Sequence, residues 1–208
     1  MIESVENAAQ LALVLGCAGV CAAKALRSRS REWLMLTLFY GSFALGDGYW
    51  LLYLMFYGQT PRLFYASDLC WYAAYLYLYL LLQRVSTSEE RSARYYSLLP
   101  LPLFAGGMAA FYLRWGDWAG NLISAVLMSL LMWHAVRGLK WLRGRPEEGS
   151  RRGLYIAVLV FCAIEYAAWT ASCFWMGDTW MNPYFWFDSL LTLSLACFLP
   201  AAGRAVAA

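Results

Sequence analysis

Charged residues and histidine are both scarce in this chain of 208 residues. Asp, Glu, Lys and Arg together make up 14% of the sequence, whereas hydrophobic residues make up 62%. A soluble domain of this size needs a more polar surface, so the composition excludes that class. His134 is the only histidine. A single histidine excludes a haem held by paired histidines, and no Ser/His/Asp triad is predicted, because no acidic residue and serine accompany it.

Metal-binding and redox motifs are also missing from the sequence. The six cysteines include no CxxC pair and no Cys/His spacing suited to a metal, so we expect neither a metal nor a cofactor. Most of the cysteines are expected to be small packing residues inside helices. Cys70 and Cys173 fall in the same half of the predicted bundle, where an oxidising compartment would permit a disulfide. The sequence leaves that pairing open.

Long apolar runs are what the chain has in abundance. They are long enough to cross the hydrocarbon of a membrane as helices, and they are apolar all round instead of alternating, which disfavours strands. They span residues 8–25, 33–57, 63–83, 98–113, 118–139, 154–176 and 184–202. The predicted fold is all-α: one domain over residues 1–208, a polytopic integral membrane protein with a bundle of seven transmembrane helices.

The basic residues are divided unequally between the connections. Of the 16 Lys and Arg residues, all but Arg62 and Arg114 lie on one side of this threading. The positive-inside rule then places the N-terminus outside and the C-terminus in the cytoplasm. We therefore expect a multi-pass protein of the cell membrane, namely the bacterial plasma membrane. The net charge of +3 is expected to favour anionic membrane lipids, not nucleic acid.

Acidic residues interrupt four of the apolar runs. They are Asp47, Asp68, Glu165 and Asp188. A charged side chain at mid-membrane costs at least about 2.5 kcal/mol, so each acid needs a reason to be there. The predicted orientation places all four in the outer half of the bundle, where the predicted helices hold no basic residue to neutralise them.

Aromatic residues share the helix faces of these acids at helical spacing. We predict that the faces point inward and line an outward-facing ligand pocket. Its predicted residues are Asp47, Trp50, Asp68, Tyr72, Glu165, Trp169 and Asp188. Carboxylates and aromatic rings suit an organic amine or quaternary ammonium through charge pairing and cation–π attraction. The predicted ligand is therefore a small cationic or amphipathic molecule.

Three short stretches resemble the second and third helices of bacterial seven-helix sensor modules. They are Gly46-Asp47-Gly48-Tyr49-Trp50, Gly58-Gln59-Thr60-Pro61 and Ala66-Ser67-Asp68-Leu69-Cys70-Trp71-Tyr72. In that family the module precedes a cytoplasmic output domain such as a diguanylate cyclase or a histidine kinase. No output domain follows here, so the resemblance implies a receptor-like module that signals through a cytoplasmic or membrane partner.

Other functions fit the same acids. A small transporter could use them to carry protons coupled to a substrate, although the sequence shows no internal repeat. Gly46-Asp47 and Asp188-Ser189 also resemble a pattern in membrane hydrolases of the lysoplasmalogenase type, but that family's downstream histidine and its additional span are missing. Neutral acids hydrogen-bonded to Tyr or Ser hydroxyls would need no ligand. No catalytic residue is assigned, and enzymatic activity stays open.

Overall fold

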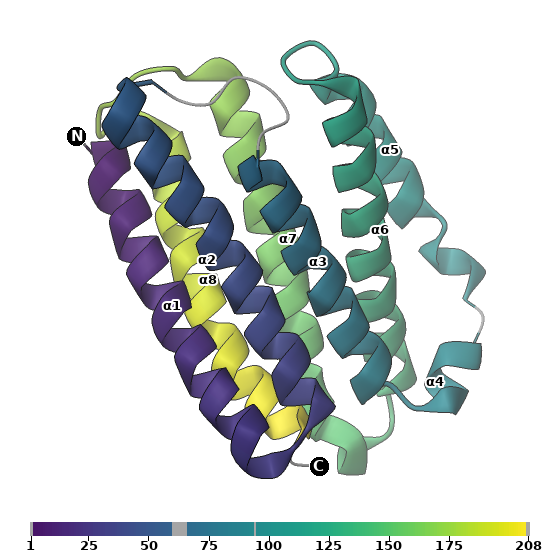
Figure 1. The fold of residues 1–208 in the computed structure, drawn as a ribbon. Coiled ribbons are helices and arrows are strands. Elements are labelled where there is room, and N and C mark those ends of the chain that lie inside the picture. Colours follow the sequence, from purple (N-terminus) through teal and green to yellow (C-terminus); the bar gives the residue numbers. More distant parts are fainter. Residues whose placement is uncertain (1, 60–65, 94, 207–208) are drawn as a thin grey trace.

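The computed structural model describes residues 2–59, 66–93 and 95–206, without the side chains of residues 146–148. This part of the chain is helical, with no strand in the described ranges (Figure 1). The helices are α1 (Ile2–Ser28), α2 (Arg31–Tyr57), α3 (Ala66–Val85), α4 (Ser88–Ser92), α5 (Pro100–Tyr112), α6 (Trp118–Trp141), α7 (Arg152–Phe174) and α8 (Pro183–Val206), with short 3-10 helices at Tyr96–Leu98 and Pro146–Arg151. The predicted all-α class is confirmed.

Each predicted apolar run lies on one of the long helices, with shifted ends. The largest shift is in α1, which begins at Ile2 and not at Ala8, because polar residues of its first turns are buried against other helices. α5 begins at Pro100, since proline fits the first helical position, where its missing N–H is not needed. The predicted start of the third run at Leu63, and Arg62 before it, lie outside the described residues.

Four helical segments of the described chain are long and apolar enough to cross a membrane. They are Ile2–Ser28, Trp118–Trp141, Gly149–Phe174 and Pro183–Val206. The apolar segment Tyr96–Tyr112 is shorter. α2 contains two acidic residues and α3 contains one, and both helices also contain tryptophan and several tyrosines, which lower their mean hydropathy. The helices agree with a membrane protein.

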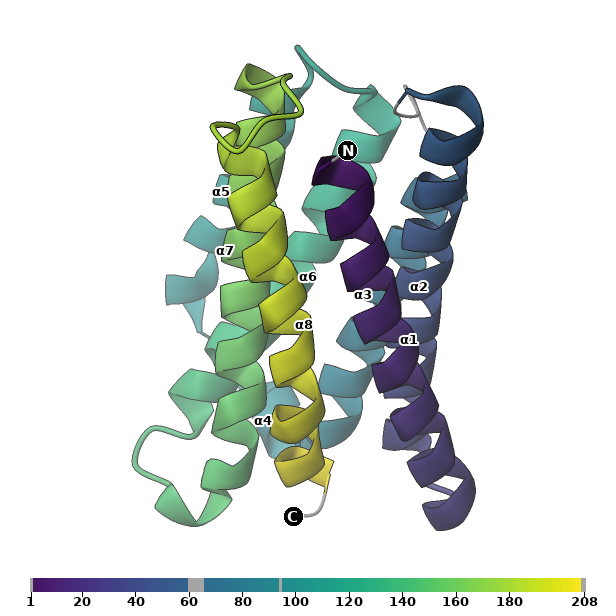
Figure 2. The ribbon, with the colours of Figure 1, turned by 90° about the vertical axis from the view of Figure 1, so that its left-hand side faces the viewer.

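A closed ring of helices forms the body of the molecule. α1, α2, α3, α6, α7 and α8 pack against one another in that order, and α8 returns to α1. α5 lies outside the ring and packs on α6. Figures 1 and 2 show the long helices side by side, with the N-terminus at one end of the bundle and the C-terminus at the other. We call these the N-terminal end and the basic end.

The basic end takes its name from the connections that meet there. The arginine-bearing segments between α1 and α2, between α3 and α5, and between α6 and α7 lie at this end (Figure 1). A buried ion pair joins Glu90 Oε2 of α4 to Arg151 Nη1 at 2.6 Å. Tyr155 of α7 donates its hydroxyl to Glu90 Oε1, also at 2.6 Å. These contacts hold the connection around α4 against the start of α7.

Aromatic side chains fill the middle of the ring. Phe39 packs edge-to-face on Phe43, Phe161 and Phe198, with ring centroids 5.5 to 6.4 Å apart. We call these rings the aromatic floor. Phe39 and Phe161 are each closer than Asp47 and Glu165 to the basic ends of their helices. The floor therefore closes the centre of the bundle beneath those acids.

Candidate functional site

A cavity of about 440 Å³ occupies the N-terminal half of the ring above the aromatic floor. We call it the acid cavity. Side chains of α1, α2, α3, α7 and α8 line it, together with the connection between α7 and α8. Its acidic lining residues are Glu3, Asp47, Asp68, Glu165, Asp178 and Asp188. No Lys, Arg or His is among the described residues that line it.

Asp47 of α2 is held by an indole from α3. Trp71 Nε1 donates to Asp47 Oδ1 at 3.0 Å. The residue is only 1% exposed, yet its second oxygen, Oδ2, is buried without a hydrogen-bond partner in the described chain. A buried carboxyl oxygen without a partner carries a desolvation cost that a donor or a cation in the cavity would relieve.

Glu165 of α7 is held in a similar way. The hydroxyl of Tyr75, again from α3, donates to Glu165 Oε1 at 2.8 Å. Both side chains are buried, and the Tyr75 ring also packs on Phe161 of the aromatic floor at 5.7 Å. Each of the two deep acids therefore receives one hydrogen bond from an aromatic side chain of α3, which fixes its position in the cavity wall.

Asp188 of α8 lies against a second acid. Its carboxyl group lies next to the carboxyl group of Glu6 and the amide group of Gln10, both on α1. Asp188 is buried, and both carboxyl oxygens of Glu6 are buried without a hydrogen-bond donor in the described chain. Two adjacent carboxylates repel each other unless they share a proton or a cation lies between them.

Glu3 of α1 forms hydrogen bonds with two other residues that line the acid cavity. Trp50 Nε1 donates to Glu3 Oε1 at 3.2 Å, and the Glu3 backbone N–H donates to Asp178 Oδ1 at 3.2 Å. The first joins α1 to α2, and the second joins α1 to the α7–α8 connection. Trp50 also packs on Trp71 with ring centroids 5.6 Å apart. Acidic and aromatic side chains thus lie side by side in this part of the cavity lining.

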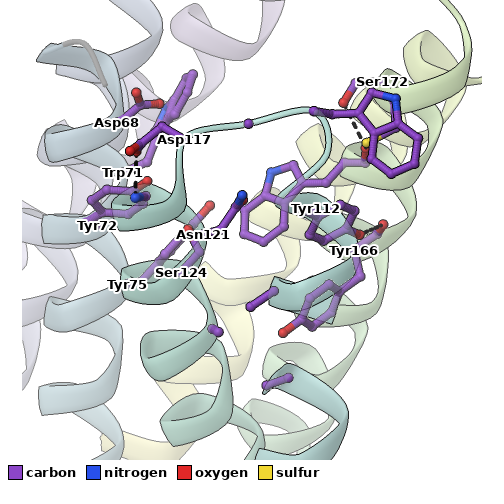
Figure 3. A pocket seen from close by; sticks show the side chains of 18 of the residues that line it. Asp68, Trp71, Tyr72, Tyr75, Tyr112, Asp117, Asn121, Ser124, Tyr166 and Ser172 are labelled. Carbon is purple, nitrogen blue, oxygen red and sulfur yellow. Dashed lines mark hydrogen bonds between the residues drawn. The ribbon is translucent and has the colours of Figure 1, made fainter. Parts of the chain in front are cut away.

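A second cavity, of about 280 Å³, adjoins the first between α3, α5, α6 and α7. We call it the side cavity. Figure 3 shows Asp68, Tyr72 and Asp117 on one side of it and Tyr112 and Tyr166 on the other. Asp117 caps α6 by accepting hydrogen bonds from the backbone N–H groups of Ala119 and Gly120. Its carboxylate is therefore occupied by the helix end.

The structure brings the sequence-predicted site residues together in these two cavities. Asp47, Trp50, Asp68, Glu165, Trp169 and Asp188 line the acid cavity. Tyr72 does not: it lines the side cavity, where its hydroxyl lies close to Gly120 of α6. Tyr72 therefore contributes to the side cavity alone, whereas Asp68 and Tyr75 on the same stripe of α3 line both cavities.

Sequence analysis missed the contribution of α1 and the importance of Trp71 and Tyr75. Glu3, Asn7 and Gln10 line the acid cavity but precede or interrupt the first apolar run. Their helical spacing continues through the buried Val14 and Cys17, and that pattern could have revealed them. For Trp71 and Tyr75, only the tertiary arrangement of α2, α3 and α7 shows which acid each one reaches.

The structure also places Cys70, Cys173 and His134. Cys70 and Cys173 are free thiols, so the disulfide that the sequence left open does not form. His134 lies away from both cavities and is buried, with Gln83 Nε2 at 3.0 Å from its Nε2 atom and Arg137 Nη2 at 2.7 Å from its Nδ1 atom.

Metal-ligand geometry and similarity to known proteins assign no chemistry to the described part of the chain. Within the described ranges, no group of three or more His, Cys, Asp or Glu side chains is placed to hold a metal ion. The chain matches no protein-family model, no curated protein and no solved structure. The acid cavity and the side cavity are therefore the features of the described chain that bear on its function.

Proposed function

We propose that the chain is a seven-helix membrane module that binds a small organic cation in the acid cavity. In this proposal the N-terminal end faces outside and the basic end faces the cytoplasm, as the distribution of arginines favours. The single observation that carries it is the buried, half-satisfied carboxyl of Asp47 in a cavity whose described lining holds no base. A cation would supply the missing partner.

The shape and lining of the cavity favour an organic cation. A volume of about 440 Å³ lies within the range of small-molecule sites. Trp50, Trp71 and Trp169 contribute ring surface beside the carboxyl groups, and aromatic faces attract ammonium groups most strongly where water is excluded. Glu165 of α7 and Asp188 of α8 provide further carboxyl groups in the lining.

A sensory role would depend on the hydrogen bonds that connect the acids to α3. Asp47 and Glu165 belong to different helices, and both are bound by side chains of α3. A cation between them would change the balance of charge across α2, α3 and α7 and bias how these helices pack. A cytoplasmic or membrane partner would detect that change at the basic end.

A small proton-coupled transporter is the second candidate, and the contact between Glu6 and Asp188 favours it. Two adjacent buried acids can hold a proton that a substrate cation displaces. The aromatic floor separates this pair from the basic end, so transport would require the floor to open. Uptake of radiolabelled tetramethylammonium into proteoliposomes, driven by a pH gradient, would identify a transporter. Binding without uptake would identify a sensor.

Binding itself is tested by calorimetric titration of the detergent-purified full chain with tetramethylammonium chloride, with sodium chloride at equal ionic strength as the blank. Asp47→Asn and Glu165→Gln should each weaken binding about tenfold or more, because each removes a charge from a desolvated site. Glu89→Gln, at an exposed acid of the basic end, is the matched control and should bind normally. Absence of binding, or equal affinity in all variants, would reject the proposal.

A further inference from the structure

The acid cavity and the side cavity share one wall. Both are lined by Trp50, Asp68, Trp71, Tyr75, Trp169 and Ser172. The two spaces are therefore separated by single side chains and not by a helix. A ligand in one cavity is within a side chain's thickness of the other.

The shared wall contains the groups that hold the deep acids. Trp71 donates to Asp47, and Tyr75 donates to Glu165. Both of these aromatic side chains line the acid cavity and the side cavity. A group that enters the side cavity would therefore lie beside the side chains that position the acids.

The size and the lining of the side cavity suit an aromatic ring. Its lining includes the rings of Tyr112 and Trp115 and the small side chains of Ala105, Ala109 and Ala125. An apolar cavity of about 150 Å³ is enough for benzene, and this one measures about 280 Å³. It therefore has room for an aromatic ring with a substituent.

Two buried polar groups of the side cavity have no partner. Tyr166 is 7% exposed, and its hydroxyl is buried without a hydrogen bond in the described chain. Asn121 Nδ2 is in the same state. Both residues line the side cavity, where Figure 3 labels them. Buried polar atoms are nearly always paired, so these two call for a hydrogen-bonding group on whatever occupies the space.

We propose that the side cavity is a second subsite of the same binding site, and that the ligand is an elongated aromatic cation. Its ammonium end lies in the acid cavity between Asp47 and Glu165. Its ring enters the side cavity past Trp71 and Tyr75, and a hydroxyl on the ring pairs with Tyr166 or Asn121. This inference rests on the proposed function, because it extends the cation site already described.

The test compares three probes on the detergent-purified full chain by calorimetric titration. Tetramethylammonium reaches only the acid cavity, (3-phenylpropyl)trimethylammonium adds a ring, and its 4-hydroxyphenyl analogue adds the polar group. The ring should strengthen binding about tenfold or more, as expected for burial of a phenyl group. The hydroxyl should strengthen it further.

Matched variants locate the ring. Ala109→Phe fills the side cavity and should abolish the gain from the ring without changing tetramethylammonium affinity. Ala110→Phe, at the exposed neighbouring position of α5, should retain the gain. Tyr166→Phe removes only a hydroxyl and should reduce the preference for the 4-hydroxyphenyl probe, which keeps the test informative if Ala109→Phe fails to fold.

The outcomes separate the two proposals. If tetramethylammonium does not bind, the proposed function fails. If it binds with no gain from the ring, or if the gain survives in both Ala109→Phe and Tyr166→Phe, the second subsite is wrong while the cation site stands. A ring-dependent gain that is lost in Ala109→Phe and kept in Ala110→Phe supports the subsite.

Discussion

The indole of Trp71 packs so closely on Gly46 that no side chain fits between them. A Cβ atom at Gly46 would lie 2.6 Å from Trp71 Nε1 and 2.8 Å from Cδ1. This approach lets the same Nε1 atom reach Asp47, the next residue of α2. The glycine thus determines how α3 presents its hydrogen bond to the buried acid.

Gly46→Ala should therefore displace the Trp71 indole and break its hydrogen bond to Asp47. Overpacking of this kind costs about 1 to 3 kcal/mol, so we expect a lower thermal midpoint and weaker tetramethylammonium binding. Gly48→Ala is the control, because its Cβ would meet only Leu11 Cδ1 at an ordinary 3.9 Å. Equal behaviour of the two variants in thermal denaturation and titration would argue against this packing.

Tyr75→Phe should destabilise the bundle and loosen Glu165. The change leaves a buried carboxyl oxygen without its donor, which costs about 1 to 3 kcal/mol. The free energy of unfolding, measured by titration with SDS in mixed micelles, should fall accordingly. Tyr77→Phe, on the same helix but lining neither cavity, should have little effect. An equal loss in both variants would show that the hydroxyl of Tyr75 has no special role.

Glu90→Gln should be among the most damaging changes at the basic end. It leaves Arg151 buried without the charge that it pairs with, and breaking a buried ion pair costs about 3 to 5 kcal/mol. The exposed pair between Arg84 and Glu32 offers the contrast: Arg84→Ala should cost less than about 1 kcal/mol. Unfolding in mixed micelles compares them, and similar losses would contradict a buried ion pair.

The proposed orientation predicts which connection a membrane-impermeant maleimide reaches in intact cells. Thr179 is exposed between α7 and α8, and Arg143 is exposed between α6 and α7. Thr179→Cys should be labelled above the background of the native cysteines, whereas Arg143→Cys should be labelled only after the cells are opened. The reverse pattern would invert the topology.

Much of the architecture follows from local properties of the sequence. Long apolar runs form helices because a backbone in an apolar environment must satisfy its own hydrogen bonds. Asp47, Glu165 and Asp188 stand out within such runs, and the rings beside them on the same faces predict where acids and aromatics gather. This local pattern located six of the residues that line the acid cavity, namely Asp47, Trp50, Asp68, Glu165, Trp169 and Asp188.

The tertiary structure determined which aromatic side chain pairs with which acid. Whether Tyr72 or Tyr75 reaches an acid depends on which helices lie on either side of α3, and no local signal carries that information. Helix α1 contributes Glu3, Glu6 and Gln10 only because it closes the ring between α2 and α8. The approach of Trp71 to Gly46 joins residues far apart in the chain. Helix formation depends on neighbours in sequence, whereas a site depends on which faces meet, and that is set by packing between distant segments.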